Sequence, residues 1–150
     1  MKSHYYLFVL ALLISCCSSN KEISSKDDLP FLNYNVILGE GGGFTGNQTG
    51  YFIDTLGVVK SFNGITFSKS KMNIIGKLSN AQINEINILI QTIKDKKYNQ
   101  NGNMTSYLVL TKNNNELRFS WENTVPDKNA PPELLSFYQK VTDLINKLNK

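Results

Sequence analysis

TSYLVLTKNNNELRFSW (Thr105–Trp121) predicts a β-hairpin, and the segments on either side of it extend the fold. The first run, Thr105–Thr111, is rich in apolar and β-branched residues, which suit a strand. The second run, Glu116–Trp121, alternates between polar and apolar side chains, so one of its faces belongs to a core and the other is charged. Between them, Lys112–Asn115 has the asparagines of a turn.

Amphipathic helices are predicted on both sides of this hairpin. The segment before it starts with SNAQ at Ser79–Gln82, an S-x-x-Q capping box that satisfies two otherwise unpaired amide donors. Apolar residues then recur every three or four positions, as on the buried face of a helix: Ile83, Ile86, Leu89, Ile90 and Ile93. The segment after the hairpin starts near Pro132 and Glu133, which suit a first turn. Its apolar stripe comprises Leu134, Phe137, Val141, Leu144 and Leu148.

Shorter apolar runs before the first helix predict further strands. Gly50–Asp54 and Gly57–Phe62 flank a turn and predict a second hairpin. Other extended segments are expected at Asn35–Leu38, Gly64–Phe67 and Met72–Leu78. The order of strands, helix, hairpin and helix predicts one α+β domain over residues 31–150, with an antiparallel sheet of about four to six strands and two packed helices.

Residues 1–15 have the pattern of a lipoprotein signal peptide. Lys2 precedes an apolar run from Tyr5 to Ile14, which is shorter than the roughly 20 residues of a spanning helix. The run ends in LISC, which resembles the bacterial lipobox: an aliphatic residue, a small residue and then the acylated cysteine. This resemblance implies cleavage before Cys16 and a diacylglycerol on its thiol. The alternative is an ordinary secreted protein with two incidental cysteines.

Residues 16–30 are polar and serine-rich, which predicts a disordered tether after the lipidated cysteine. Two or more acyl chains hold a protein on a membrane stably, so we expect a lipid-anchored protein of the cell envelope. Cys17 follows Cys16 where an aspartate would signal retention. By resemblance to lipoprotein sorting rules, this favours the outer membrane over the inner one.

Cysteine and histidine usage excludes several kinds of chemistry. Both cysteines lie at the predicted cleavage site, and the only histidine, His4, lies in the segment predicted to be removed. A mature domain without these residues has no thiolate nucleophile, Ser-His-Asp triad, His-rich zinc site or internal disulfide. What remains for catalysis is carboxylate, hydroxyl or amine chemistry. Our prediction is a domain with no catalytic residues, no metal and no cofactor. The 16 basic and 12 acidic residues are scattered without an arginine cluster, which disfavours a nucleic-acid partner.

A glycine-rich stretch, GEGGGFTGNQTG at Gly39–Gly50, contains the pattern G-x-G-x-x-G. A phosphate-binding glycine loop of that type leads into a helix, whose free amides hold the phosphates. Here Asn47–Ile53 alternates like a strand, so the stretch predicts a connection between two strands and no nucleotide site.

Two interpretations of this connection remain open. In the structural one, consecutive glycines provide positive φ or a bulge, and Phe44 is tucked inward. In the functional one, a loop with few side chains lets another protein's backbone come close, and Phe44 and Thr45 are its anchors. The candidate protein-binding residues are Gly41, Gly42, Gly43, Phe44, Thr45 and Gly46.

GGFTG at Gly42–Gly46 resembles the GGF-[AT]-G signature of small domains similar to emfourin, the proteinaceous inhibitor of thermolysin-like metallopeptidases. The resemblance extends in outline to the order of elements from Asn35 to Leu148, including a strand with a tyrosine, Tyr107. Gly102–Met104 departs from it, because that family tends to have Pro-Asp there. The chain also resembles uncharacterised envelope lipoproteins with a GGGFTG motif. These resemblances imply a non-enzymatic module that binds a protein, with a peptidase as the narrower expectation.

Two alternatives belong to other classes. Glu116 and Glu122 lie near Trp121, an arrangement that would suit an enzyme using carboxylates on a polysaccharide. However, both lie on one strand, and Trp121 is in phase with the core positions Leu117 and Phe119, so a core tryptophan is the expectation. The other alternative is a structural envelope component without a discrete ligand.

Overall fold

The computed structural model describes residues 30–65, 70–100, 102–123 and 130–148. The described elements follow one another along the chain as β1 (Asn35–Gly42), β2 (Gln48–Ile53), β3 (Val58–Gly64), β4 (Lys71–Lys77), α2 (Asn80–Ile93), β5 (Met104–Lys112), β6 (Asn115–Glu122) and α3 (Pro132–Asn146). This is one antiparallel sheet of six strands with two helices, which confirms the predicted α+β class.

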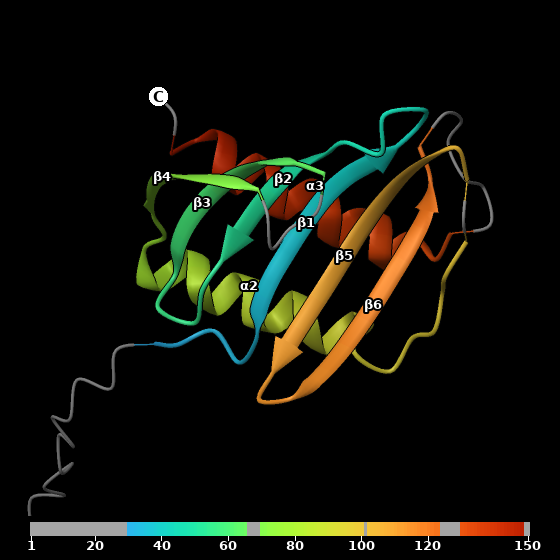
Figure 1. Ribbon diagram of the computed structural model, residues 1–150. Coiled ribbons are helices and arrows are strands. Elements are labelled where there is room, and N and C mark those ends of the chain that lie inside the picture. The colour runs from blue at the N-terminus through green and yellow to red at the C-terminus, as the bar shows by residue number, and fades with distance from the viewer. Residues whose placement is uncertain (1–29, 66–69, 101, 124–129, 149–150) are drawn as a thin grey trace, which may run out of the picture.

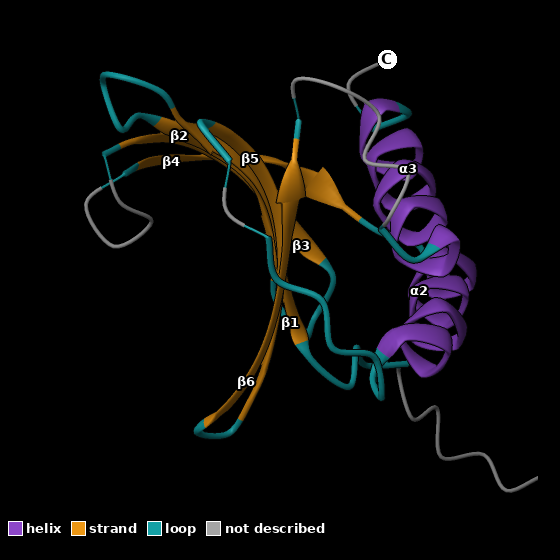
Figure 2. Ribbon diagram, turned by 90° about the vertical axis from the view of Figure 1, so that its right-hand side faces the viewer, coloured by secondary structure: helices purple, strands orange, loops and turns teal. Residues whose placement is uncertain are grey.

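The strands lie in the order β4-β3-β2-β1-β5-β6, so the first strand of the chain lies inside the sheet (Figure 1). β1 pairs with β2 on one side and with β5 on the other, and every neighbouring pair is antiparallel. Both helices lie on the same side of the sheet, and the sheet curves away from them at its ends (Figure 2). We call these two sides the helix face and the open face.

The main core fills the space between the helix face and the two helices. The register puts Val36 beside Leu110 and Leu38 beside Leu108, and all four side chains are buried on the helix face. Most residues of the predicted stripes are buried: Ile83, Ile86, Ile90 and Ile93 in α2, and Leu134, Phe137, Val141 and Leu144 in α3. Leu89 and Leu148 of those stripes are half-buried, and Ile145 of α3 is buried as well.

The predicted capping box holds the start of α2. The Ser79 hydroxyl accepts from the Gln82 amide at 3.3 Å, and the Ser79 amide donates to Gln82 Oε1 at 2.8 Å. Beyond the end of the helix, Lys96 pairs with Glu133 in the first turn of α3 at 3.2 Å. Trp121 is buried on the helix face and meets Tyr138 of α3 edge-on at 5.2 Å, so the expectation of a core tryptophan is confirmed.

Three features differ from the predictions. β1 continues past Leu38 to Gly42, because the glycines keep the register with β2 and β5. Ser120 lies on the side of β6 that was predicted to be charged, but it is buried. The segment around Asn99 covers that edge of the sheet, and the Ser120 backbone is hydrogen-bonded to the backbones of Tyr98 and Gln100. The β5–β6 turn contains only Asn113 and Asn114, with Asn113 at φ 54°. The signal peptide and most of the tether lie outside the described residues, as do Thr66 and Phe67.

Candidate functional site

The glycine-rich connection between β1 and β2 is a projecting hairpin loop at one end of the sheet (Figure 1). Phe44 is at its turn with a relative exposure of 109%, and Thr45 beside it is also exposed. The interpretation in which Phe44 is tucked inward is therefore wrong. The glycines on either side of Phe44 have no side chains that could cover its ring.

The loop backbone requires glycine at its tip, and it is hydrogen-bonded to the segment just before β5. Gly42, Gly43 and Gly46 have φ values of 116°, 65° and 62°, in the left-handed region that other residues rarely adopt. The Gly43 amide donates to the Asn103 carbonyl just before β5. A Cβ on Gly42 would lie 2.4 Å from that same carbonyl oxygen, so the two backbones touch there.

Met104 extends the exposed apolar surface next to the loop. It opposes Gly42 in the β1–β5 register and is 36% exposed. A Cβ built on Gly43 would lie 3.3 Å from the Met104 sulfur, so the thioether lies against the loop. We call Phe44, Thr45 and Met104 the loop patch. Met104 was not among the residues that sequence reasoning singled out, because only the β1–β5 register brings it here.

The base of the loop is fixed by aromatic rings on the open face. Gly39 and Gly50 are direct cross-strand partners in β1 and β2. A Cβ on Gly39 would lie 2.4 Å from the Tyr107 ring, and one on Gly50 would lie 2.8 Å from the Phe62 ring. The two rings therefore lie across the strands where the glycines have no side chains, and both are buried although neither α2 nor α3 covers this face.

Tyr107 connects this aromatic cluster to the start of β2. Its hydroxyl donates to Gln48 Oε1 at 3.1 Å, and Gln48 is the first residue after the loop. The Arg118 guanidinium lies 5.3 Å from the centre of the Tyr107 ring, in cation–π geometry. Burial raises the pKa of Tyr107 to about 12, and Arg118 partly opposes that shift by favouring the phenolate. Arg118, on the charged side of β6, thus contacts an aromatic ring.

The carboxylates of the alternative enzyme hypothesis lie on the other side of the sheet from Trp121. Glu116 opposes Thr111 and Glu122 opposes Thr105, which places both on the open face. Trp121 opposes Ser106 and packs in the core on the helix face. Glu116 and Glu122 therefore do not flank the Trp121 ring, as the carboxylates beside a carbohydrate platform would.

Two findings concern metals and membranes. Within the described residues, no group of three or more His, Cys, Asp or Glu side chains lies close enough to hold a metal ion. None of the helices in the described ranges combines the length and the apolar character that crossing a bilayer requires. Cys16, the predicted lipid attachment site, lies outside the described residues.

Comparison with known proteins gives no family to which this chain can be assigned. No protein-family model matches it, and no curated protein matches it either.

Proposed function

We propose that this protein is a lipid-anchored module of the cell envelope that binds another protein through the loop Gly41–Gly46. The observation that carries the proposal is the complete exposure of Phe44 at the tip of a hairpin loop whose base is held on both strands. A large apolar side chain in water has no stabilising role of its own, whereas aromatic side chains that fill a partner's pocket dominate many interfaces.

The construction of the loop favours binding with little loss of conformational entropy. The Gly43–Asn103 hydrogen bond and the ring of Tyr107 over Gly39 restrict the hairpin before any partner arrives. A pre-organised loop loses less conformational freedom on association than a loose one. The glycines beside Phe44 add no side chains, so a partner's backbone can approach the hairpin closely.

A thermolysin-like metallopeptidase is the partner class that we propose. The support is the resemblance of Gly42–Gly46 to the emfourin signature, together with the exposure of its phenylalanine. A loop that occupies a peptidase cleft without being hydrolysed has to be rigid, and both its ends here are strands of one sheet. The proposed activity is therefore inhibition by tight, non-covalent occupation of the cleft.

The test combines inhibition with a matched pair of variants. The purified full chain is incubated with a thermolysin-like peptidase, and hydrolysis of a small peptide substrate is followed as the chain is titrated. Phe44→Ala is expected to weaken inhibition by about 30-fold, equivalent to a hot spot of about 2 kcal/mol. Leu56→Ala is the control, because Leu56 is also exposed at a turn, but in the β2–β3 turn at the opposite end of the hairpin.

Failure of the peptidase assay would overturn the partner class, and a capture experiment then tests binding itself. Proteins retained from envelope extract by the wild-type chain are compared with those retained by Phe44→Ala and Leu56→Ala. If the three sets are identical, the loop is not a binding site.

The lipid anchor has its own test. Cys16→Ala should move the protein from the detergent phase to the aqueous phase on partitioning, because the lipobox resemblance implies that the diacylglycerol is attached to that thiol. A mutant that stays in the detergent phase would contradict the lipobox assignment. A Cys17→Ala variant is the control, and it should partition like the wild type.

A further inference from the structure

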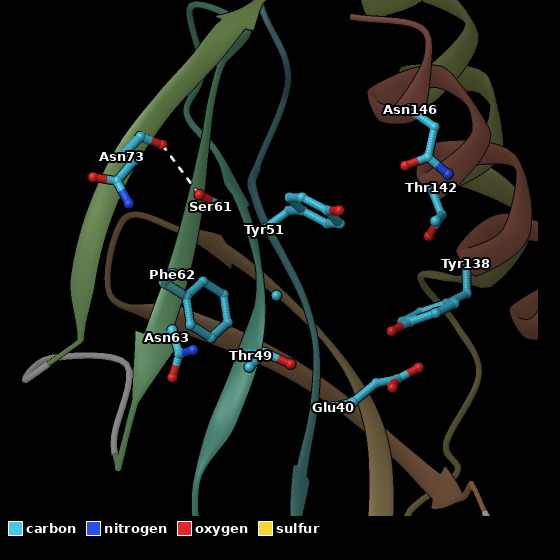
Figure 3. Close-up of a pocket in the computed structure, with 11 residues that line it drawn as sticks. Glu40, Thr49, Tyr51, Ser61, Phe62, Asn63, Asn73, Tyr138, Thr142 and Asn146 are labelled. Carbon is cyan, nitrogen blue, oxygen red and sulfur yellow. Dashed lines mark hydrogen bonds between the residues drawn. The ribbon is translucent and has the colours of Figure 1, made fainter. Parts of the chain in front are cut away.

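A pocket of about 550 Å³ lies on the helix face, between α3 and the strands β1 to β4 (Figure 3). At this end the sheet bends away from α3 (Figure 2), so the helix and the strands do not close on each other as they do over the core. Ligand pockets commonly enclose about 300 to 1,000 Å³, so the space suits a small molecule. The pocket is separate from the loop patch, and Phe44 does not line it.

At this pocket the residues on the helix face of the strands change from apolar to polar. Along β1 and β2 the inward positions change from the buried pair Val36 and Ile53 to Glu40 opposite Thr49. Along β3 the inward position after Val59 is Ser61. α3 changes in the same direction, from apolar side chains to Thr142 and Asn146 along its pocket side.

Most of these polar side chains are open to solvent. Ser61 and Thr142 are half-buried, and the others are exposed: Glu40, Thr49, Asn63, Asn73 and Asn146. The polar groups of the strands and of α3 face one space, together with the rings of Tyr51 and Tyr138 (Figure 3). Exposed hydroxyl and carboxamide groups that converge on one space are available to hydrogen-bond a polar ligand.

Two tyrosines give the pocket an aromatic wall. Tyr51 from β2 and Tyr138 from α3 both point into it (Figure 3). The Tyr138 hydroxyl donates to the Gly39 carbonyl at 3.4 Å, which fixes the ring beside Glu40. Burial raises the pKa of the Tyr138 hydroxyl, and the Glu40 carboxylate raises it further, so this phenol stays protonated at neutral pH.

The lining distinguishes between ligand classes. Among the residues that line the pocket, Glu40 provides the one charge and no Lys, Arg or His is present. Phosphates and other anions are disfavoured by that charge. The remaining polar groups are hydroxyls and asparagine amides, which both donate and accept. A ligand with many hydroxyl groups and some apolar C–H surface for the tyrosine rings satisfies this lining, and that description fits a saccharide.

We propose that this pocket binds a short saccharide, with Glu40 accepting hydrogen bonds from its hydroxyl or amino groups. Glycoside hydrolysis uses two carboxylates on either side of the bond, whereas this pocket has one, so binding occurs without cleavage. The proposal is independent of the loop, because it concerns a different surface and a different class of ligand.

Trp121 provides a reporter for the site. It is the only tryptophan of the chain, and it meets Tyr138 edge-on at 5.2 Å. A ligand against Tyr138 changes the surroundings of that ring and therefore the emission of Trp121. The full chain, purified in a detergent without a sugar headgroup, is titrated with three probes: oligomers of N-acetylglucosamine, of glucosamine and of glucose. Butylammonium is a fourth probe, which has the charge of an amino sugar but no hydroxyl groups.

At least one saccharide series is expected to give a saturable change in emission by millimolar concentration. Glu40→Gln should weaken that binding about tenfold or more, as expected for loss of a charged hydrogen-bond acceptor. Thr49→Val keeps the shape of the side chain and should weaken it as well. Glu116→Gln is the matched control, since Glu116 is an exposed strand carboxylate on the open face, and Phe44→Ala is the control for the loop.

Three results would overturn the proposal. The first is no saturable change with any saccharide. The second is binding that Glu40→Gln and Thr49→Val leave unaltered, with both variants folded by circular dichroism. The third is butylammonium binding as tight as that of the glucosamine oligomers, which would make the site a simple cation site. If no saccharide binds but protein binding that depends on Phe44 is observed, this inference fails and the proposed function stands.

Discussion

Gly39 and Gly50, at the base of the β1–β2 hairpin, are needed for a different reason from Gly42, Gly43 and Gly46 at its tip. The base pair has ordinary strand conformation, but a Cβ on either residue would collide with a ring on the open face. The tip glycines have positive φ, and a Cβ on Gly46 would meet nothing within 4 Å. The base is thus limited by space and Gly46 by backbone conformation, while Gly42 is limited by both, since its Cβ would also meet the Asn103 carbonyl.

The difference between base and tip bears on the proposed binding loop. At the base, Tyr107 and Phe62 cover the glycines and form a small second cluster with Val109. That cluster ties the hairpin to β3 and β5 on the face that neither α2 nor α3 covers. The tip can then project with an exposed aromatic side chain and still hold its shape. Substitutions of the base glycines and of the tip glycines should therefore lower the free energy of unfolding by different amounts, and different second substitutions should restore it.

Gly50→Ala should give the largest loss of stability. The added Cβ would lie 2.0 Å from the Leu38 carbonyl oxygen, a backbone atom that cannot move without breaking the β1–β2 ladder. Overpacking typically costs 1 to 3 kcal/mol, and a clash with backbone should reach about 3 kcal/mol. Urea unfolding followed by circular dichroism measures this loss. A cost below about 1 kcal/mol would show that the strands separate there easily.

Gly39→Ala should cost about 1 to 3 kcal/mol, because its Cβ would meet the end of the Tyr107 ring and a side chain can shift where a backbone cannot. The cost should nearly disappear in a Tyr107→Val background, which removes the ring. A double-mutant cycle on unfolding free energies measures this coupling. If the two substitutions are additive, the ring does not limit the base.

Alkaline pH should weaken the base while leaving the tip unaffected. Tyr107 has a pKa of about 12 in the folded protein, against about 10 when unfolded. The folded state holds its proton more tightly, so this stabilisation is complete below pH 10 and is lost as pH rises through 12. At pH 11 the loss from Tyr107 is about 1.4 kcal/mol.

Tyr107→Phe is the comparison for this pH dependence. Its unfolding free energy should fall less steeply between pH 10 and 12 than that of the wild type. Absorbance at 295 nm checks the assignment, since the phenolate of Tyr107 should be missing from the spectrum until high pH. Identical slopes in the two proteins would show that Tyr107 titrates like a free tyrosine.

Elements with a regular side-chain period were predictable from the sequence, and those without one were not. The capping box at Ser79 and the isoleucine stripe after it have a local cause, so α2 was predicted correctly. β1 was predicted too short, because a glycine shows no alternation and only the pairing with β2 and β5 reveals its strand. The pocket between α3 and the strands was not predicted, because only the placement of α3 shows that Thr49 and Ser61 line a common space with it.

Only part of the loop's structure could be predicted from the sequence. Alternation after Gly46 correctly indicated a second strand, which excluded a phosphate-binding helix start. The direction of Phe44 depends on Asn103, far along the chain, whose carbonyl holds Gly43, and no local pattern encodes that contact.

Gly46→Ala should cost about 1 kcal/mol, less than either base substitution. An alanine has room there, but its Cβ makes the left-handed conformation at φ 62° unfavourable by 1 to 2 kcal/mol. Gly46→Asn should be milder, since asparagine tolerates that region better. The unfolding free energies of the two variants give the comparison, and equal costs would indicate that Gly46 is limited by something other than its φ.

Phe44→Ala should have the smallest effect on stability, within about 0.5 kcal/mol of the wild type, because the ring contacts water on all sides. The same substitution has the largest effect expected on protein binding, so a residue at the tip acts on function and not on folding. The unfolding free energy is measured on the protein used for the inhibition assay, which separates the two effects. A destabilisation above about 1 kcal/mol would mean that Phe44 packs against its own chain in solution, and the loop would then lose the side chain that makes it a binding site.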